Sequence, residues 1–232
     1  GQVKGRGSPA EAQQVWKRWF GRDRCDGAAL SQEERKQITA SVAAIQSLLG
    51  GPFFAKDISN SLRVRALDAV FPGCLFIRIS RDPLAIAKSI LKARHEYRQN
   101  RDFAMTDNPK NEWVFINSKD FEQFYDEPYL QQIASQIFHT ENILEKDLGT
   151  LPESRFLQIE YENFCADPRR EIQRLRDFAA SHNIRLKDKS MVPESFNRPP
   201  REESLNPEQQ REHNKLRALI DSNYASSRLV KT

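Results

Sequence analysis

The chain has 232 residues, of which 38% are hydrophobic, and this is enough for one substantial α/β core. Its 36 basic and 32 acidic residues are well mixed and leave a formal charge of only +4, so the sequence lacks the basic stripe of a nucleic-acid-binding protein. We therefore expect a single domain over residues 1–232, with anionic ligands and no nucleic-acid partner.

The cysteines and the hydropathy pattern indicate in which cellular compartment the protein works. Cys25, Cys74 and Cys165 are scattered without the spacing of metal ligands, and their odd number favours a reducing environment over a disulfide framework. No apolar run approaches the length of a membrane span. We therefore expect a cytoplasmic protein with no metal site and no membrane association.

The first fifth of the chain reads as helical. Residues 9–20 predict a helix that carries Trp16 and Trp19, and residues 31–49 predict a longer one. Ser31 and Glu34 have the spacing of a capping box at its start. Two glycines, Gly50 and Gly51, end it.

Two strand–turn–helix units follow. In the first, residues 53–55 predict a short strand that ends at Lys56 and Asp57, and an amphipathic helix then runs to Phe71, with Ser59 or Asn60 as its cap. In the second, residues 75–79 predict an interior strand, and Asp82 and Pro83 predict the start of a helix. In one parallel sheet, both strands would end at the same edge.

The residues at this edge of the predicted sheet indicate an anion site. Arg81 ends the second strand and Ser89 lies in the helix that follows, where free helix N–H groups and the positive end of the helix dipole favour a phosphate. Lys56 would add a second cation from the first unit. Simpler interpretations are a turn-stabilising ion pair for Arg81, a solvated surface serine for Ser89, and a surface pair between Lys56 and Asp57.

The second half of the chain is again mainly helical. Residues 100–119 predict a polar loop, and residues 121–148 one long helix that Gly149 ends. Residues 191–206 are rich in proline and charge, carry Arg198 and Arg201, and predict a mobile linker before a C-terminal helix over residues 207–224.

Residues 53–94 resemble the core of the sulfotransferases that use PAPS (3′-phosphoadenosine 5′-phosphosulfate), especially the bacterial branch and, more distantly, the tyrosylprotein enzymes. The resemblance rests on KDISNSLR, then ALDAVFP, then FIRISRDPLAIAKS, in that order and at close spacing. It implies a helix-rich α/β fold, namely a P-loop-NTPase-like three-layer sandwich with a central parallel sheet.

The resemblance also assigns roles to single residues. Arg81 and Ser89 match the pair that binds the 3′-phosphate of PAPS, and Lys56 matches a lysine that assists the sulfuryl group in transit. The stretch from Arg155 to Phe178 is similar to the family's strand, Tyr-Glu-Asp-Leu motif and Pro-started helix, and it puts Tyr161 near the adenine. Here Asn163 replaces the acidic residue, and a packed core edge is the alternative for a tyrosine at a strand end.

One part of the family pattern is missing from the sequence. The glycine-rich loop that holds the 5′-phosphosulfate should follow a first apolar strand, but Gly5 and Gly7 have no such strand before them and are better explained as linker residues. We therefore expect that this strand and its loop precede Gly1.

The expected activity is transfer of a sulfuryl group from PAPS to a hydroxyl or amine of a small-molecule, carbohydrate or peptide acceptor, with PAP (adenosine 3′,5′-bisphosphate) as the product and no metal. One alternative is a P-loop nucleotide or nucleoside kinase, although the sequence shows neither a Walker-type Gly-Lys-Ser/Thr nor an evident Mg²⁺-holding Asp. Another is a non-catalytic module that retains the 3′-phosphate site and binds nucleotide only.

Overall fold

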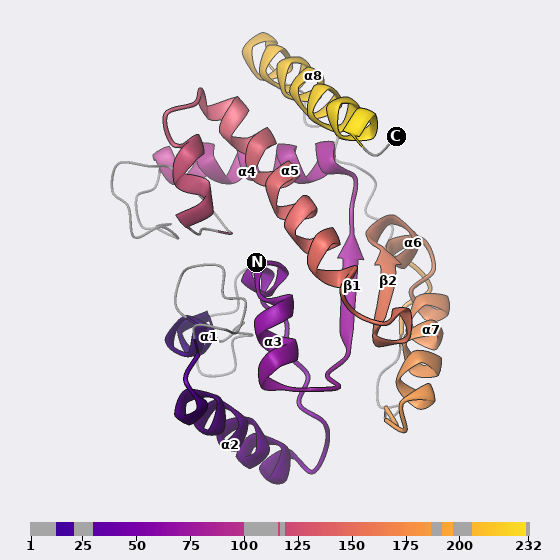
Figure 1. Ribbon diagram of the computed structural model, residues 1–232. Helices are drawn as coiled ribbons and strands as arrows, with labels where there is room; N and C mark the ends of the chain where they lie inside the picture. Colours follow the sequence, from indigo (N-terminus) through magenta and orange to yellow (C-terminus); the bar gives the residue numbers. More distant parts are fainter. Residues whose placement is uncertain are drawn as a thin grey trace. The chain divides into compact units, whose positions relative to one another are not determined.

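The computed structural model describes residues 13–20, 30–99, 116, 119–186, 192–196 and 206–230. These residues form a helix-rich α/β structure with a small parallel sheet (Figure 1). Two compact units share the chain, and the expectation of a single domain stays a prediction. The first unit comprises Gly1–Cys74, Arg94–Asp126 and Thr140–Asp147, and the second comprises Leu75–Ala93, Glu127–His139 and Leu148–Thr232.

The first unit begins with helices α1 (Gln13–Phe20) and α2 (Gln32–Leu49). The capping box predicted for α2 is confirmed, because the Ser31 hydroxyl accepts a hydrogen bond from the Glu34 amide at 3.2 Å and the Glu34 carboxylate accepts one from the Ser31 amide at 2.8 Å. Gly50 ends the helix in the left-handed region, with φ of 64°. Glycine adopts this conformation without steric cost.

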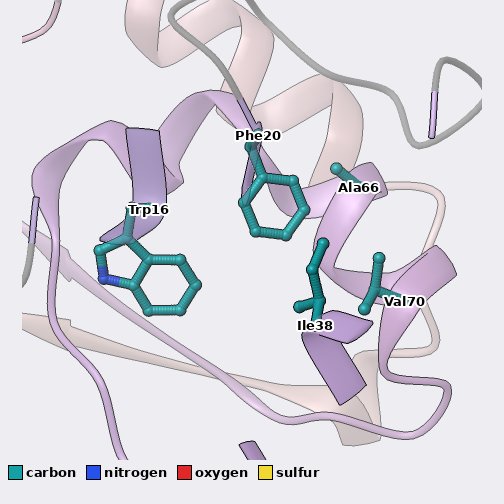
Figure 2. Packing of buried hydrophobic residues seen from close by; sticks show 5 residues of the cluster. All are labelled: Trp16, Phe20, Ile38, Ala66 and Val70. Carbon is teal, nitrogen blue, oxygen red and sulfur yellow. The ribbon is translucent and has the colours of Figure 1, made fainter. Parts of the chain in front are cut away.

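Helices α1, α2 and α3 (Val64–Val70) of this unit pack on an apolar cluster, which Figure 2 shows from close by, and a second cluster includes Leu62, Phe121 and Ile143. The Trp16 and Phe20 rings from α1 are stacked with centroids 6.1 Å apart, and Ile38 of α2 is only 2% exposed beneath them. Helix α3 adds Ala66 and Val70. Burial of these side chains, more than the propensity of the short helices, stabilises the arrangement.

The strand predicted over residues 53–55 is wrong. Phe53 packs against the Trp16 cluster, whereas Phe54 is 70% exposed, and no described segment pairs with this part of the chain. The buried carboxylate of Asp57 caps the 3₁₀ helix η1 (Ile58–Leu62) by accepting a hydrogen bond from the Ser59 amide at 2.7 Å. Neither Ser59 nor Asn60 caps the amphipathic helix as predicted: Asp57 caps η1, and α3 begins after Arg63 without a side-chain cap.

The sheet lies in the second unit. Strands β1 (Phe76–Ser80) and β2 (Phe156–Glu160) pair in parallel, with Phe76 opposite Phe156 and Ser80 opposite Glu160, and they lie side by side in Figure 1. The partner of β1 is thus β2 and not residues 53–55. Ile79 is 62% exposed, so β1 is less buried than its apolar sequence predicts. The described sheet has two strands, and the three-layer sandwich stays a prediction.

Two helices follow β2, and the family resemblance predicted only the second of them, which starts at a proline. Helix α6 (Tyr161–Ala166) begins at the residue after the strand, and helix α7 (Pro168–Ser181) begins at a proline. Asp167 caps α7 by accepting a hydrogen bond from the Arg170 amide at 3.0 Å. Both helices contact the β2 side of the sheet, where they fix the end of that strand.

Three further helices complete the described chain. Helix α4 (Pro83–Gln99) follows β1, and α8 (Pro207–Val230) begins with a reciprocal cap between Asn206 and Gln209. The single helix predicted over 121–148 is shorter: η2 (Lys119–Phe124) is separate, and α5 (Tyr129–Leu148) starts after Pro128, whose ring tolerates only the start of a helix. The 3₁₀ turn η3 (Glu153–Arg155) leads into β2.

Several predictions fall outside the described residues. These are the linker role of Gly5 and Gly7, nearly all of the polar loop over 100–119, and the contribution of Arg198 and Arg201. Within the described part of the chain, no helix is both long and apolar enough to cross a membrane.

Candidate functional site

The register of the two strands brings Arg81 and Tyr161 together. Ser80 is opposite Glu160, so the next residue on each strand leaves the sheet at the same edge. The guanidinium carbon of Arg81 lies 4.6 Å from the centroid of the Tyr161 ring, which is a cation–π contact. Arg81 is exposed and Tyr161 is 39% exposed, so both side chains are accessible from solvent.

Carboxylate side chains accept hydrogen bonds from the backbone amides at the start of α4. Asp82 accepts hydrogen bonds from the amides of Leu84 at 3.1 Å and Ala85 at 3.2 Å, while its own amide donates to the Glu162 carboxylate at 3.4 Å. The expectation that these helix N–H groups are free for a phosphate is therefore wrong, because acidic side chains already satisfy them. The guanidinium of Arg81 is left as the main attraction for an anion at this edge.

Ser89 is exposed on α4. It comes seven residues after Asp82, which is two turns, so it lies on the helix face that Asp82 begins, about 10 Å farther along the axis. The structure therefore places Ser89 in the helix that follows β1, two turns after Asp82.

The charge of Arg81 is not neutralised by an ion pair with any described residue. The turn-stabilising ion pair considered from the sequence is thus absent from the described part of the chain. An exposed guanidinium has five N–H donors in a planar fork that matches two oxygens of a phosphate. Its stacking on Tyr161 leaves the edge of this fork available.

The surroundings of Tyr161 keep its hydroxyl protonated. A hydrogen bond between the hydroxyl and the Cys165 thiol, one helical turn away, raises the pKa of Tyr161 above its ordinary value. The electrostatic effect of Cys165, the loss of hydration and Glu162 also raise the pKa of Tyr161, while Arg81 lowers it. Arg81 therefore faces a neutral ring at physiological pH.

Acidic residues flank this cation. Besides Asp82 and Glu162, the edge carries Glu160, whose carboxylate accepts a hydrogen bond from the Asn163 amide group at 2.7 Å. The sequence interpretation missed Glu162 and Cys165, although parallel strand ends in register imply that residues one step further along also lie close. No group of His, Cys, Asp and Glu with the geometry of a metal site occurs among the residues that the structure describes.

Lys56 lies in the first unit and is exposed. It belongs to an extended segment and not to a strand end, and the Asp57 carboxylate beside it bonds the Ser59 amide and forms no ion pair within the described residues. The surface pair considered for Lys56 is therefore not formed. The role of Lys56 near Arg81 stays a prediction.

Comparison with known families identifies the chain. A family model described as Sulfotransferase family matches residues 8–181, which is more than half of the chain and includes Lys56, Arg81, Ser89 and Tyr161. The protein belongs to the sulfotransferase family, which confirms the resemblance and supports sulfuryl transfer as its general activity. No curated protein and no solved structure gave a match.

Proposed function

We propose that the protein is a PAPS-dependent sulfotransferase that transfers the sulfuryl group to a hydroxyl or amine and releases PAP. The observation that carries this proposal is the exposed guanidinium of Arg81, at the paired ends of two parallel strands in a chain of the sulfotransferase family. Parallel sheets bind ligands at the carboxyl ends of their strands.

The residues at this edge fit the nucleotide part of PAPS. Arg81 would bind the 3′-phosphate through two N–H groups, and the Ser89 hydroxyl would add a neutral hydrogen bond. Tyr161 offers a neutral, half-exposed aromatic ring for an adenine, and it also holds the guanidinium in place. These residues therefore match a nucleotide, in which a ribose carries both a phosphate and an aromatic base.

The protein's own contribution to the reaction is binding, orientation and charge stabilisation. PAPS supplies the activated sulfuryl group when it is bound. Arg81 and Ser89 would fix the nucleotide, and Lys56 would stabilise the negative charge that develops at the leaving oxygen. Neither a covalent protein intermediate nor a metal ion is needed for transfer by this route.

The wider parts of this proposal follow the family. The acceptor is a small molecule, a carbohydrate or a peptide, and the fold around the described strands is P-loop-like. Action in the cytoplasm is proposed from the odd number of cysteines and not from the family. A single sulfotransferase-like domain over residues 1–232 accounts for both compact units.

Nucleotide preference tests the proposal. In calorimetric titrations, PAP should bind at least about tenfold more tightly than AMP, because AMP lacks the 3′-phosphate that Arg81 recognises, and ATP with Mg²⁺ should gain nothing from its added phosphates. A preference for ATP–Mg²⁺ would favour a kinase. Tight PAP binding without release of PAP from PAPS in the presence of a broad set of acceptors would favour a non-catalytic module.

A further inference from the structure

A carboxylate bridges the two strand ends beside Arg81. Glu162 directly follows Tyr161 in the chain, and its Oε1 accepts a hydrogen bond from the amide of Asp82, the residue that directly follows Arg81, at 3.4 Å. Its negative charge also reaches the Tyr161 hydroxyl, whose pKa it helps to raise. Glu162 therefore contacts the residue that follows Arg81 and directly follows the tyrosine whose ring Arg81 contacts.

The other carboxylates at this edge already have partners. Asp82 accepts two hydrogen bonds from the first turn of α4, and Glu160 accepts a short one from Asn163. Within the described residues, Glu162 makes one long hydrogen bond, whereas a carboxylate has about four lone-pair sites. Glu162 is thus the least engaged of the three carboxylates, because Asp82 accepts two hydrogen bonds and the one that Glu160 accepts is short.

A carboxylate beside an anion site has two opposite effects on a ligand. It repels the bound phosphate, since like charges a few ångströms apart destabilise each other. It also attracts any hydroxyl that lies next to that phosphate, because hydrogen bonds to an ionised acceptor are among the stronger ones. A phosphate ligand that brings such a donor is therefore favoured over one that lacks it.

We propose that Glu162 is a specificity-determining residue that recognises a hydroxyl next to the phosphate bound by Arg81. This inference rests on the proposed function and names the group that the nucleotide must carry beside its 3′-phosphate, which is the free 2′-hydroxyl of the ribose. Carboxylates at the ends of parallel strands bind ribose hydroxyls in dinucleotide sites by the same chemistry. Glu162 makes the site selective for ribonucleotides over deoxyribonucleotides.

The experiment removes one protein group, the Glu162 carboxylate, and one ligand group, the 2′-hydroxyl, first separately and then together, as in a double-mutant cycle. Calorimetry would give the dissociation constants of PAP and of 2′-deoxyadenosine 3′,5′-bisphosphate for the wild type, Glu162→Gln and Glu160→Gln. Glutamine keeps an oxygen that can accept the Asp82 amide, so the turn retains its hydrogen bond while the charge is removed. Glu160→Gln is the matched control. It removes an equal charge at the same edge, from a carboxylate that accepts a hydrogen bond from Asn163.

We expect the wild type to bind PAP about tenfold more tightly than the deoxy compound. The ratio of the two dissociation constants should fall below about threefold in Glu162→Gln and should stay about tenfold in Glu160→Gln. A wild type that binds both nucleotides equally would overturn the inference without any variant. Equal ratios in the wild type and Glu162→Gln would also overturn it, while PAP binding itself would leave the proposed function standing. Failure of the wild type to bind PAP would overturn both.

Discussion

The guanidinium of Arg81 lies 4.6 Å from the ring centroid of Tyr161, although 79 residues separate the two in the chain. The contact follows from the parallel register, in which Ser80 and Glu160 are opposite and the next residues leave the sheet together. It ties the end of β1 to the start of α6 and holds the cation at the strand edge.

Removing the Tyr161 ring should weaken nucleotide binding, whereas removing its hydroxyl should not. Tyr161→Ala deletes the aromatic face that holds Arg81, and a cation–π contact at an exposed site contributes about 0.5–1 kcal/mol. Tyr161→Phe keeps that face and should bind PAP within about twofold of the wild type. Calorimetric titration of both variants checks this, and a large loss in Tyr161→Phe would assign the role to the hydroxyl instead.

Removing Cys165 should lower the pKa of Tyr161. The hydrogen bond between the two side chains is the largest cause of its raised value, so Cys165→Ala should shift the tyrosine titration to lower pH. Tyrosinate absorbance would be followed against pH, with Tyr161→Phe subtracted to isolate this tyrosine from the other four. Cys74→Ala, which replaces a cysteine of the first unit, should leave the titration unchanged.

The same shift predicts how stability depends on pH. The folded state raises the pKa of Tyr161 above its unfolded value, so the folded protein binds this proton more tightly. The contribution to the free energy of unfolding is complete below the unfolded pKa of about 10 and is lost as pH rises through the folded value. Urea unfolding above that pH should show a smaller loss in Cys165→Ala than in the wild type.

Lys56 should affect turnover more than nucleotide affinity. If it acts on charge that develops only in the transition state, Lys56→Ala should reduce turnover on the order of a hundredfold and leave PAP binding within a few-fold. Lys36→Ala, on the exposed face of α2 in the same unit, is the control and should retain activity. Unimpaired turnover in Lys56→Ala would show that Lys56 is only a surface residue.

The first unit depends on the apolar cluster of α1, α2 and α3. Ile38→Ala removes a side chain that is 2% exposed between α1 and α3, so the free energy of unfolding should fall by about 2–4 kcal/mol. Leu48→Ala, on the same helix but 87% exposed, should change it by less than about 0.5 kcal/mol. Urea unfolding measures both, and equal losses would place Ile38 outside a packed core.

Local signals in the sequence predicted much of this fold. The capping box of Ser31, the glycine stop at Gly50 and the Asp82–Pro83 helix start each depend on residues within one turn, and all three are present. The strand predicted at residues 53–55 failed because Phe53 is used in helix packing, which three apolar residues cannot reveal. The helix predicted from residue 121 failed because Pro128 outweighs the apolar periodicity.

The cation of the candidate site could be predicted from the sequence, but the groups around it could not. A family resemblance and a strand end sufficed to select Arg81, Ser89 and Tyr161. The pairing of β1 with β2 depends on contacts between distant segments, and only that pairing shows that Glu162 reaches the Asp82 amide. The amides of Leu84 and Ala85 are not free as we expected, because the Asp82 carboxylate accepts hydrogen bonds from both within its own turn.

The central claim is that Arg81 binds the 3′-phosphate of the nucleotide. Calorimetric titration of PAP into the wild type and Arg81→Ala tests it most directly, with Arg170→Ala as a control for the loss of an exposed arginine on α7 of the same unit. We predict a loss of about 2 kcal/mol or more in Arg81→Ala, about 1 kcal/mol in Ser89→Ala, and no change in Arg170→Ala. Equal affinity for PAP in the wild type and Arg81→Ala would contradict the site assignment.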